Sequence, residues 1–290
     1  MPELPDLAVV VDAFHAALAG RRVVRAEAPA PLAVRGTPAE LVALVGQRLA
    51  AVRRRGKFVT FELQRDRVVV NAMLTGRFQL AHPEARKPAS TGLVLAFGER
   101  PGPPEDAAPW TQGAAWLPVD GEAVEVRYRD PSQMGKVYLL PAGQARTVPG
   151  LDPGLGPDAD DPGLTIERWR ERIRRHPGEL KGLLRHQAFV AGIGNAYSDE
   201  ILHAARLNPF RKRPSLAPEE IDELYAATRT TLARAIDVLR RRVPPTFETQ
   251  VRDFLAVHLR EGQPCPRCGG RLSHVSSRGE STSWCRSCQR

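Results

Sequence analysis

The sequence Cys265-Pro-Arg-Cys268, followed after residues 269–284 by Cys285-Arg-Ser-Cys288, decides the fold of the end of the chain. Two Cys-x2-Cys pairs at this separation are typical of a structural zinc site with four thiolate ligands. Zinc ligation supplies folding free energy that a segment of about thirty residues cannot obtain from a hydrophobic core. The polar run from Ser273 to Ser283 suits a β-hairpin between the pairs. We predict one structural zinc ion per chain, held in a small ribbon by Cys265, Cys268, Cys285 and Cys288.

Two other interpretations of this segment are weaker. His258 and His274 are alternative ligands, but four cysteines already satisfy zinc, so we expect both histidines on the surface. A redox role is disfavoured because neither cysteine pair follows a strand of a βαβ unit. All four cysteines of the chain lie in this segment, which favours metal over disulfides.

Upstream of the ribbon the chain begins with a helix and continues with strands. Leu4 to Leu18 predicts an amphipathic helix that ends at Gly20. Its apolar stripe at helical spacing consists of Leu7, Val10, Val11, Phe14 and Leu18. Short apolar runs separated by turn residues then predict a sandwich or barrel. These runs are Arg22–Ala26, Leu49–Arg53, Phe58–Leu63, Arg67–Ala72, Gly92–Phe97, Ala123–Tyr128 and Val137–Leu140. Glu99 to Gly113, rich in proline and glycine, is predicted to be a flexible surface insertion.

A boundary rich in Pro, Gly and Asp, Pro149 to Gly163, separates this half from a helical half. Four helices are predicted beyond it, at Ile166–Arg175, Glu179–Leu184, Ser198–Ala205 and Pro218–Val243. The order of elements is therefore β first, helices second and a metal ribbon last, which is an α+β arrangement.

The charge of the chain favours a nucleic-acid partner without establishing one. The 290 residues include 42 Lys+Arg and 33 Asp+Glu, for a net charge of +9. Arginine suits phosphate because its planar guanidinium binds oxygens bidentately. The sequence has no apolar run long enough to cross a membrane and does not begin with a secretory signal pattern. We expect a cytoplasmic protein of bacterial type, associated with the nucleoid.

The start of the chain, Met1-Pro2-Glu3-Leu4-Pro5-Asp6, places an amine beside a carboxyl group. Removal of Met1 makes Pro2 a secondary amine, and terminal amines have pKa values of about 7.7–8.0, so part of the population is neutral near pH 7. A neutral amine can attack an aldehyde-like carbon and form an iminium. Glu3 is placed to move protons. The alternative is a disordered start that contains proline by chance.

Gly192-Ile-Gly194-Asn195 lies between two predicted helices, ahead of Ser198-Asp199-Glu200. Two glycines let the backbone turn sharply and approach a ligand closely. The amides at the start of the following helix face that turn and attract phosphate. A tight turn between helices, with no ligand, is the simpler interpretation.

Together these segments resemble the formamidopyrimidine-DNA glycosylase/endonuclease VIII family of bifunctional base-excision repair enzymes. The order and spacing of the matching motifs are highly specific, and the motifs run nearly from end to end. They are Pro-Glu-Leu-Pro-Asp at 2–6, Arg54-Arg-Gly-Lys57-Phe, Leu74-Thr-Gly76, Asp130-Pro131 with Gly135, Leu180-Lys181, Gly192-Ile-Gly-Asn195-Ala-Tyr197, Ala205-Arg-Leu-Asn-Pro209, and the ribbon ending Cys288-Gln289.

The resemblance implies an N-terminal β-sandwich with a flanking helix, a helix–two-turn–helix domain and a zinc ribbon. We expect their boundaries at 1–148, 149–257 and 258–290. The family binds damaged double-stranded DNA in the cleft between the halves. We expect the same partner here, no membrane, and a monomer.

The resemblance also implies roles for individual residues. Pro2 is then the Schiff-base nucleophile at C1′ of the damaged nucleotide, and Glu3 is the acid/base that assists opening of the sugar. Lys57 is a cation on a strand of the β-domain and contacts the DNA phosphate beside the lesion. Asn195 binds backbone phosphate from the turn between helices.

Departures from the family pattern concern the residues that read the lesion. Asp6 stands where the family has Glu. The family's wedge methionine aligns with Leu74 or, shifted by one position, with Met73. In place of the family's Asp-Pro-Arg-Arg-Phe-Gly, this chain has Asp-Pro-Ser132-Gln133-Met134-Gly, which removes the arginine facing the orphaned base and places methionine at the wedge.

Further departures lie near the end of the chain. Glu280 occupies the position of a phosphate-clamping arginine in the family's ribbon, and Arg278 is a candidate to replace it in binding DNA. Pro244 to Asp253 is shorter than the loop that caps the lesion in oxidised-purine enzymes. We therefore expect weak dependence on the opposite base, and better activity on abasic sites or oxidised pyrimidines than on 8-oxoguanine.

Two functions are compatible with this sequence. The first is a DNA glycosylase with β,δ-lyase activity on oxidised bases and abasic sites, acting through a Schiff base at the N-terminal proline. The second is a DNA- or damage-binding protein of the same fold that has lost efficient base excision. Retention of Pro2, Glu3, Lys57 and Asn195 favours the enzyme.

Overall fold

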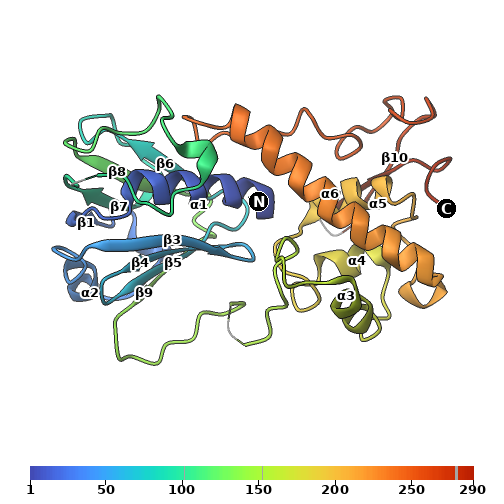
Figure 1. The fold of residues 1–290 in the computed structure, drawn as a ribbon, viewed down its shortest axis with the longest axis horizontal. Coiled ribbons are helices and arrows are strands. Elements are labelled where there is room, and N and C mark those ends of the chain that lie inside the picture. The colour runs from blue at the N-terminus through green and yellow to red at the C-terminus, as the bar shows by residue number, and fades with distance from the viewer. Residues whose placement is uncertain (101, 152, 278–279) are drawn as a thin grey trace. The chain divides into compact units, whose positions relative to one another are not determined.

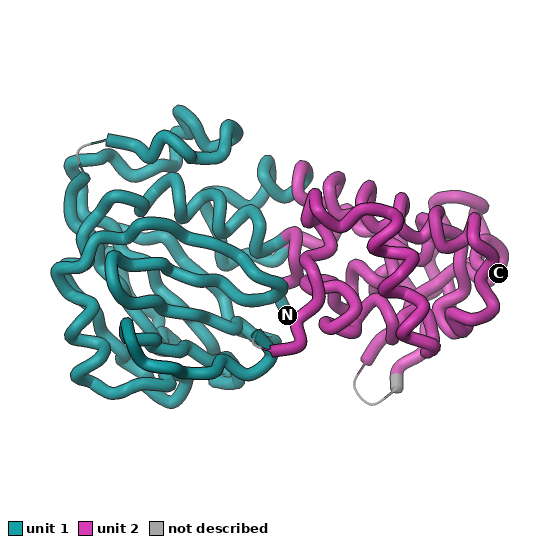
Figure 2. Tube along the Cα trace, turned by 60° about the horizontal axis from the view of Figure 1, so that its bottom comes forward, with its two compact units in different colours: residues 1–2, 6–151, 238–250 teal, residues 3–5, 152–237, 251–290 magenta. Residues whose placement is uncertain are grey.

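The computed structural model describes residues 1–100, 102–151, 153–277 and 280–290 and divides into two compact units. The first comprises residues 1–2, 6–151 and 238–250, and the second comprises residues 3–5, 152–237 and 251–290 (Figure 2). The second residue and the third therefore belong to different units, although they are neighbours in the chain.

Two β-sheets form the first unit (Figure 1). The four-stranded sheet is antiparallel and has the order β1 (Val23–Glu27), β7 (Thr91–Phe97), β8 (Val124–Arg129), β6 (Arg77–Ala81). The five-stranded sheet has the order β2 (Val34–Arg35), β9 (Lys136–Leu140), β5 (Arg67–Asn71), β4 (Phe58–Leu63), β3 (Leu49–Arg55). Only the short β2 runs parallel to its neighbour among these described strands.

Aromatic side chains fill the space between the two sheets. The rings of Phe61 on β4 and Phe78 on β6 lie 6.5 Å apart, and Tyr128 on β8 is 5.7 Å from Phe78. Phe14 of helix α1 (Leu4–Leu18) packs edge-on against Phe78 at 6.1 Å. These contacts place the core of the sandwich between the sheets and against α1.

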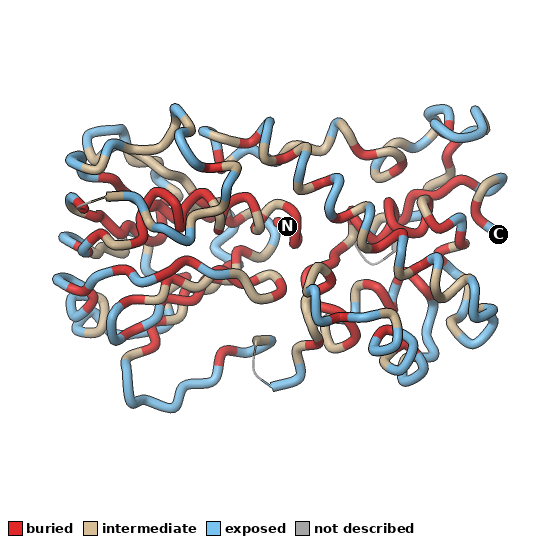
Figure 3. The backbone as a smooth tube through the Cα atoms, viewed as in Figure 1, coloured by how far each residue is buried: buried red, intermediate tan, exposed pale blue. Residues whose placement is uncertain are grey.

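Helix α1 differs from the expected amphipathic helix. The predicted stripe is buried, but so are residues on its other sides, among them Val9, Ala13 and Ala17 (Figure 3). A helix that is apolar nearly all round is covered on most sides. The cover includes the segment predicted to be flexible: Trp110 donates from Nε1 to Asp12 of α1 at 2.8 Å.

The segment 99–113, outside Pro101, lies on the surface with Glu105, Asp106 and Gly113 exposed, but it is anchored at two points. Arg100 is 7 % exposed and donates to the carbonyl of Ala16 at 2.7 Å. Thr111, in the short 3₁₀ helix Pro109–Thr111, is fully buried. The many prolines and glycines of this segment predict an irregular backbone. They do not prevent its arginine and tryptophan side chains from packing against helix α1.

The predicted strands are confirmed to within one or two residues, whereas some short elements were missed. These are β6, β2, helix α2 (Pro38–Val42) and the short 3₁₀ helices Pro31–Ala33, Pro109–Thr111 and Arg213–Ser215. Strand β6 has only five residues and one clear alternation, which is too little for a periodic signal. Helix α2 begins with a capping box formed by Thr37 and Glu40. This local signal does not by itself predict a helix, because the five residues that follow are too few to show a helical period.

The second unit is helical and ends in a hairpin. Its elements are α3 (Ile166–Ile173), α4 (Leu180–Arg185), α5 (Asn195–Ala204), the 3₁₀ helix Arg213–Ser215, most of α6 (Pro218–Arg242), β10 (Ser273–Ser277) and β11 (Glu280–Trp284). The four predicted helices are confirmed, although α5 begins three residues earlier than expected. Trp169 anchors the core, with Phe189 at 4.8 Å and Tyr225 at 5.6 Å between ring centroids.

The hairpin and the cysteine segment are attached to α5. Val257, Cys265, Leu272 and Cys285 form a small apolar cluster. Glu200 of α5 accepts backbone N–H groups of residues 256–258 at 2.7–2.9 Å, which fixes the segment leading into the ribbon. Among the described residues, no helix is both long enough and apolar enough to span a membrane.

Candidate functional site

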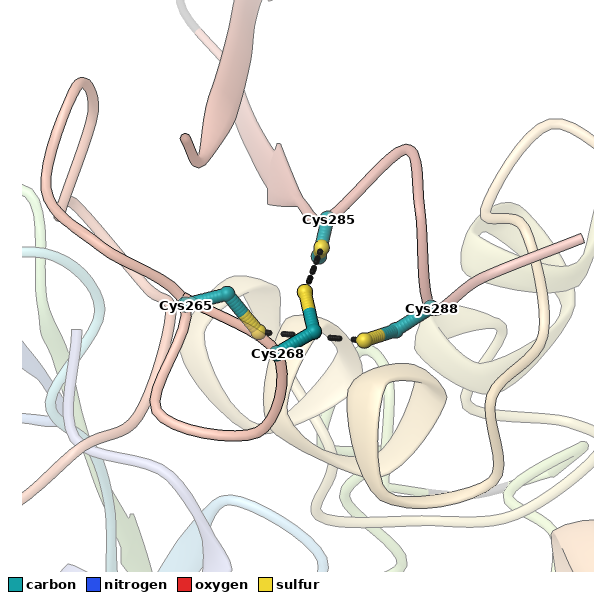
Figure 4. Close-up of side chains that lie close together, drawn as sticks. All are labelled: Cys265, Cys268, Cys285 and Cys288. Carbon is teal, nitrogen blue, oxygen red and sulfur yellow. Dashed lines mark hydrogen bonds between the residues drawn. The ribbon is translucent and has the colours of Figure 1, made fainter. Parts of the chain in front are cut away.

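The four cysteines of the ribbon converge on one point (Figure 4). Their Sγ atoms lie within 4.8 Å of one another. Cys265 and Cys288 have Sγ atoms 3.9 Å apart, and Cys268 and Cys285 have theirs 3.5 Å apart. Four Zn–S bonds of about 2.3 Å in a tetrahedron place sulfur atoms about 3.8 Å apart, so these side chains fit a zinc ion.

A buried histidine of α5 contacts this metal site. His203 is 5 % exposed, and its Nε2 lies 3.3 Å from the Sγ of Cys265. Arg267 donates to the backbone carbonyls of His203 and Ala204 at 2.8 and 3.2 Å. Burial, reinforced by the charge of Arg267, lowers the pKa of His203 to about 4. The last turn of α5 and the cysteine cluster are therefore in direct contact.

His258, expected on the surface, is held by a buried carboxylate instead. Its side chain is 9 % exposed, and its Nδ1 lies 2.8 Å from Oδ2 of Asp199. Asp199 also accepts from Nζ of Lys181 at 2.5 Å and from the backbone N–H of Ser283 at 3.3 Å. A buried carboxylate requires such partners because it has lost its hydration. His274 is partly exposed, and neither histidine belongs to the cysteine cluster.

Glu3 is buried in the second unit, where its carboxylate binds the start of α5. Oε2 accepts the N–H of Gly194 at 2.6 Å and that of Tyr197 at 3.3 Å, while Oε1 accepts the N–H of Ala196 at 2.9 Å. The first N–H groups of a helix have no partner within the helix. Glu3 therefore caps α5 and places a negative charge at the positive end of its dipole.

Gly192 and Gly194 make this approach possible. Gly192 has a φ of +99°, and a Cβ there would lie 2.8 Å from Leu4 Cβ. A Cβ at Gly194 would lie 2.5 Å from Glu3 Cδ. The helix amides that we expected to attract a phosphate are thus bound by Glu3. A carboxylate tethered within the same unit has a high effective concentration, which favours it over a free anion.

Asn195 is the first residue of α5 and is only partly buried. Its Oδ1 atom is buried and has no hydrogen-bond partner among the residues that the structure describes. A buried polar atom without a partner costs free energy. The Asn195 amide oxygen is therefore a group that the fold leaves for water or for a ligand.

Pro2 and Lys57 belong to the first unit. Pro2 is buried and lines a small pocket together with Asp6, Arg77 and Gln250. Arg77 donates to the side-chain oxygen of Gln250 at 3.0 Å, which closes one side of that pocket. Lys57 lies in the turn between β3 and β4, immediately before β4, rather than on a strand.

Two exposed apolar residues of the first unit stand on loops that share one anchor. Leu74 is 47 % exposed and Met134 is 44 % exposed. Asp130, which is buried, accepts hydrogen bonds from the hydroxyl of Thr75 and from the N–H of Gly135 at 2.6 Å. Burial alone would raise the pKa of Asp130, but hydrogen bonds from these loops hold it below its ordinary value. Asp130 therefore holds together the two loops that carry Leu74 and Met134.

Comparison with known proteins matches the chain from end to end. Three family models match it: formamidopyrimidine-DNA glycosylase N-terminal domain at residues 1–137, formamidopyrimidine-DNA glycosylase H2TH domain at 155–243, and zinc finger found in FPG and IleRS at 262–290. The formamidopyrimidine-DNA glycosylase of Symbiobacterium thermophilum is 32 % identical over 300 residues, covering 100 % of this chain and 89 % of the relative. That of Heliobacterium modesticaldum is also 32 % identical and covers 100 % of both chains. The chain belongs to the formamidopyrimidine-DNA glycosylase family.

Solved structures of the family have the same fold. The Lactococcus lactis Fpg in complex with DNA containing an abasic site superposes with a TM-score of 0.81 at 24 % identity, covering 99 % of each chain. The MutM (Fpg) protein from Thermus thermophilus has a TM-score of 0.77 at 27 % identity and covers 99 % of this chain and 98 % of its own. These matches confirm the predicted α+β fold and, with the zinc-finger match and the four clustered cysteines, the structural zinc site.

Glu280, which departs from the formamidopyrimidine-DNA glycosylase pattern, has a partner that the sequence did not reveal. Arg185, the last residue of α4, donates from both terminal nitrogens to the two carboxylate oxygens of Glu280. The hydrogen bond from Arg185 holds the pKa of Glu280 below its ordinary value. Arg278, the candidate replacement cation, lies outside the described residues.

The segment 244–253 packs onto the first unit up to Gln250. Phe247 is 4 % exposed, and its ring lies 5.3 Å from Phe14 and 5.5 Å from Trp116. Glu248 accepts a hydrogen bond from Gln79 of β6 at 3.3 Å. Phe247 thus anchors this part of the segment to the sandwich.

The contacts of Asp130, His203 and Arg185 could not be predicted from the sequence. The sequence shows Asp130 only as part of a motif, and no motif marks His203 or Arg185. Asp130 and Arg185 join elements far apart in the chain, as His203 joins α5 to Cys265, so no local spacing indicates these contacts. A buried acid between two loops is recognisable only when its partners are known.

Proposed function

We propose that this protein is a base-excision repair DNA glycosylase with AP lyase activity on oxidised bases and abasic sites. Membership of the formamidopyrimidine-DNA glycosylase family supports the glycosylase assignment. One observation carries the proposal further: the carboxylate of Glu3, next to Pro2 in the chain, is fixed by three backbone amides of residues 194–197. A fixed carboxyl group beside a terminal amine is the pairing that Schiff-base chemistry at a sugar requires.

In the proposed reaction the nitrogen of Pro2, freed by removal of Met1, attacks C1′ of the damaged nucleotide. The C1′–base bond breaks and its electron pair leaves with the base. Glu3 accepts the proton that the nitrogen loses and delivers it to O4′, and the C1′–O4′ bond opens to give an iminium. Loss of a proton from C2′ then expels the 3′ phosphate, and loss of a proton from C4′ expels the 5′ phosphate. Water finally releases the sugar fragment from Pro2.

The same proposal assigns the remaining residues to binding double-stranded DNA. Lys57 contacts the phosphate beside the lesion, and Asn195 binds backbone phosphate. Leu74 and Met134, exposed on loops fixed by Asp130, fill the gap left by the flipped base. Flipping costs least for damaged or unpaired bases, which contributes to selectivity. All these residues come from one chain, so we propose a monomer that acts at the nucleoid.

The lesion preference that we propose follows from the positions where this chain departs from the family's sequence pattern. An arginine that faces the orphaned base discriminates between bases by about 1–3 kcal/mol. Ser132 and Gln133 cannot make that charged bidentate contact, and the segment anchored by Phe247 offers little to hold a flipped purine. We therefore propose greater activity on abasic sites and oxidised pyrimidines than on 8-oxoguanine.

A panel of duplexes tests this preference directly. Strands carrying 8-oxoguanine, formamidopyrimidine, an oxidised pyrimidine or an abasic site are incubated with the protein, and excision and strand cleavage are measured separately. For 8-oxoguanine we expect rates opposite cytosine and adenine to agree within about tenfold, since the discriminating contact is absent. A strong preference for 8-oxoguanine opposite cytosine would contradict the assignment.

A damaged-DNA-binding protein without efficient excision is the alternative. The loss of the arginine at the Ser132–Gln133 position favours it, because binding of an abasic site needs no reading of the orphaned base. The two functions differ in one result. The enzyme excises at least one base in the panel and cleaves at the abasic site, whereas the binding protein retains duplex without cutting it.

A further inference from the structure

Arg185 and Glu280 form an ion pair on the surface of the second unit. Arg185 is 27 % exposed in its side chain and Glu280 is 52 % exposed. Both terminal nitrogens of the guanidinium are engaged, each with a different oxygen of the carboxylate. This bidentate geometry is the one that arginine also uses with phosphate. The pair therefore contains a partly exposed guanidinium whose anion-binding edge is already occupied by Glu280.

The pair is linked to the turn that carries Asn195. Gln187 donates from Nε2 to the carbonyl of Arg185 at 2.7 Å and to the carbonyl of Ile193 at 2.8 Å. Its Oε1 accepts the N–H of Gly192 at 2.9 Å. One amide side chain therefore fixes the backbone of Arg185 against the turn. The positive charge of Arg185 would attract a phosphate bound at that turn.

The charges around Arg185 agree with its position near the turn that carries Asn195. The pKa of Arg185 is raised, first by the hydrogen bond to Glu280 and further by the charges of Glu280, Glu3 and Asp199, against the opposing effect of burial. The neighbouring cation Lys181 is 6 % exposed and is committed to Asp199 and to the carbonyl of Ser281, at 2.5 and 2.6 Å. Arg185, not Lys181, thus presents its charge to solvent here.

We propose that Arg185 binds a backbone phosphate of DNA and that Glu280 competes with this phosphate for the same edge of the guanidinium. This inference rests on the proposed function, because it concerns the DNA that the glycosylase would bind. Phosphate and carboxylate both accept from the arginine fork, so one must loosen when the other binds. Glu280 then weakens DNA binding, and it reduces the number of counterions that binding releases.

The test measures affinity for a duplex carrying a tetrahydrofuran abasic analogue, which cannot form a Schiff base, over a range of salt concentrations. Glu280→Gln should tighten binding about threefold or more and steepen the salt dependence, because a full phosphate contact contributes a slope of about 0.9. Arg185→Gln should weaken binding about tenfold and flatten the slope by about the same amount. Arg185→Lys should fall between, since it keeps the charge but loses the fork.

The double variant decides between competition and simple repulsion. If Glu280 acts through Arg185, Glu280→Gln has no effect in the Arg185→Gln background. An equal gain in both backgrounds would overturn the inference, because it would mean that Glu280 repels DNA on its own. An Arg185→Gln variant that binds as tightly as the parent, with the parent's salt slope, would also overturn it.

A matched pair elsewhere in the same unit serves as the control. Arg175 and Glu171 form an exposed ion pair on and just after α3. Glu171→Gln makes the same change of charge and should leave affinity and salt slope unaltered. Absence of binding by the parent protein would contradict the proposed function itself, whereas parent binding with unchanged variants would contradict only the inference about Arg185.

Discussion

Glu3 serves two purposes at the scale of a single residue: its carboxylate caps α5, and we propose that it also moves a proton at the sugar. The capping contacts alone make a prediction that requires no DNA. Glu3→Gln replaces one acceptor oxygen by an NH₂ group that faces backbone N–H donors. A buried donor left without an acceptor costs about 1–3 kcal/mol.

Hydrogen exchange measures this cost where it arises. In Glu3→Gln we expect protection at Gly194, Ala196 and Tyr197 to fall by about tenfold, the equivalent of 1.4 kcal/mol. Glu219→Gln is the control, because Glu219 is an exposed acid at the start of α6 in the same unit. Equal protection in the two variants would show that Glu3 does not stabilise the start of α5.

Some site residues could be predicted from the sequence because their chemistry depends on local spacing. The four cysteines are recognised by two short pairs, and Pro2 with Glu3 by position at the start of the chain. Arg185 could not be found in this way. Its significance comes from Glu280, ninety-five positions later, and only the folded chain brings the two together.

At the scale of elements, α5 connects the chain's N-terminal segment to the zinc site. Its first turn is capped by Glu3, and its last turn carries His203 against Cys265. Outer contacts to metal ligands orient the ligands and change metal affinity by about 10–100-fold. The hydrogen bond from His203 is a contact of this kind, since a thiolate accepts and a neutral imidazole has one N–H to donate.

His203→Phe should therefore release zinc about tenfold faster to a chelator, because the ring volume is kept while the N–H is lost. The cobalt-substituted protein should also show a shifted sulfur-to-metal charge-transfer band. His274→Phe is the control, as His274 is a ribbon histidine that bonds Ser281 rather than a cysteine. Identical release rates and spectra for both variants would refute a role of His203 at the metal.

Elements with a clear period or a continuous apolar run were predictable, and elements without either were not, for a physical reason. Helix α6 and strand β4 contain enough residues for their period to appear in the sequence. Strand β6 and helix α2 are formed by five residues each, and their stability comes from neighbours that the local sequence does not reveal. The anchoring of segment 99–113 was not readable for the same reason, because Trp110 and Arg100 attach it to Asp12 and Ala16 of α1.

At the scale of the whole molecule, the order of parts along the chain was readable from composition alone. A strand-rich half, a helical half and a cysteine ribbon follow one another, and the family match spans them all. The division into compact units was not readable, because residues 3–5 join the second unit and residues 238–250 join the first. Two residues that are neighbours in the chain can belong to different compact units when hydrogen bonds to distant residues fix one of them in the other unit.

Trapping of the iminium tests the central claim, that the nitrogen of Pro2 is the nucleophile. Protein with Met1 removed is incubated with duplex DNA containing an abasic site, and borohydride is added to reduce the iminium to a stable amine. We predict a covalent protein–DNA adduct linked through Pro2. Protein that retains Met1, or whose N-terminus is acetylated, should give no adduct while still binding DNA, because affinity comes from many phosphate contacts. Equal trapping by the blocked protein would contradict the claim.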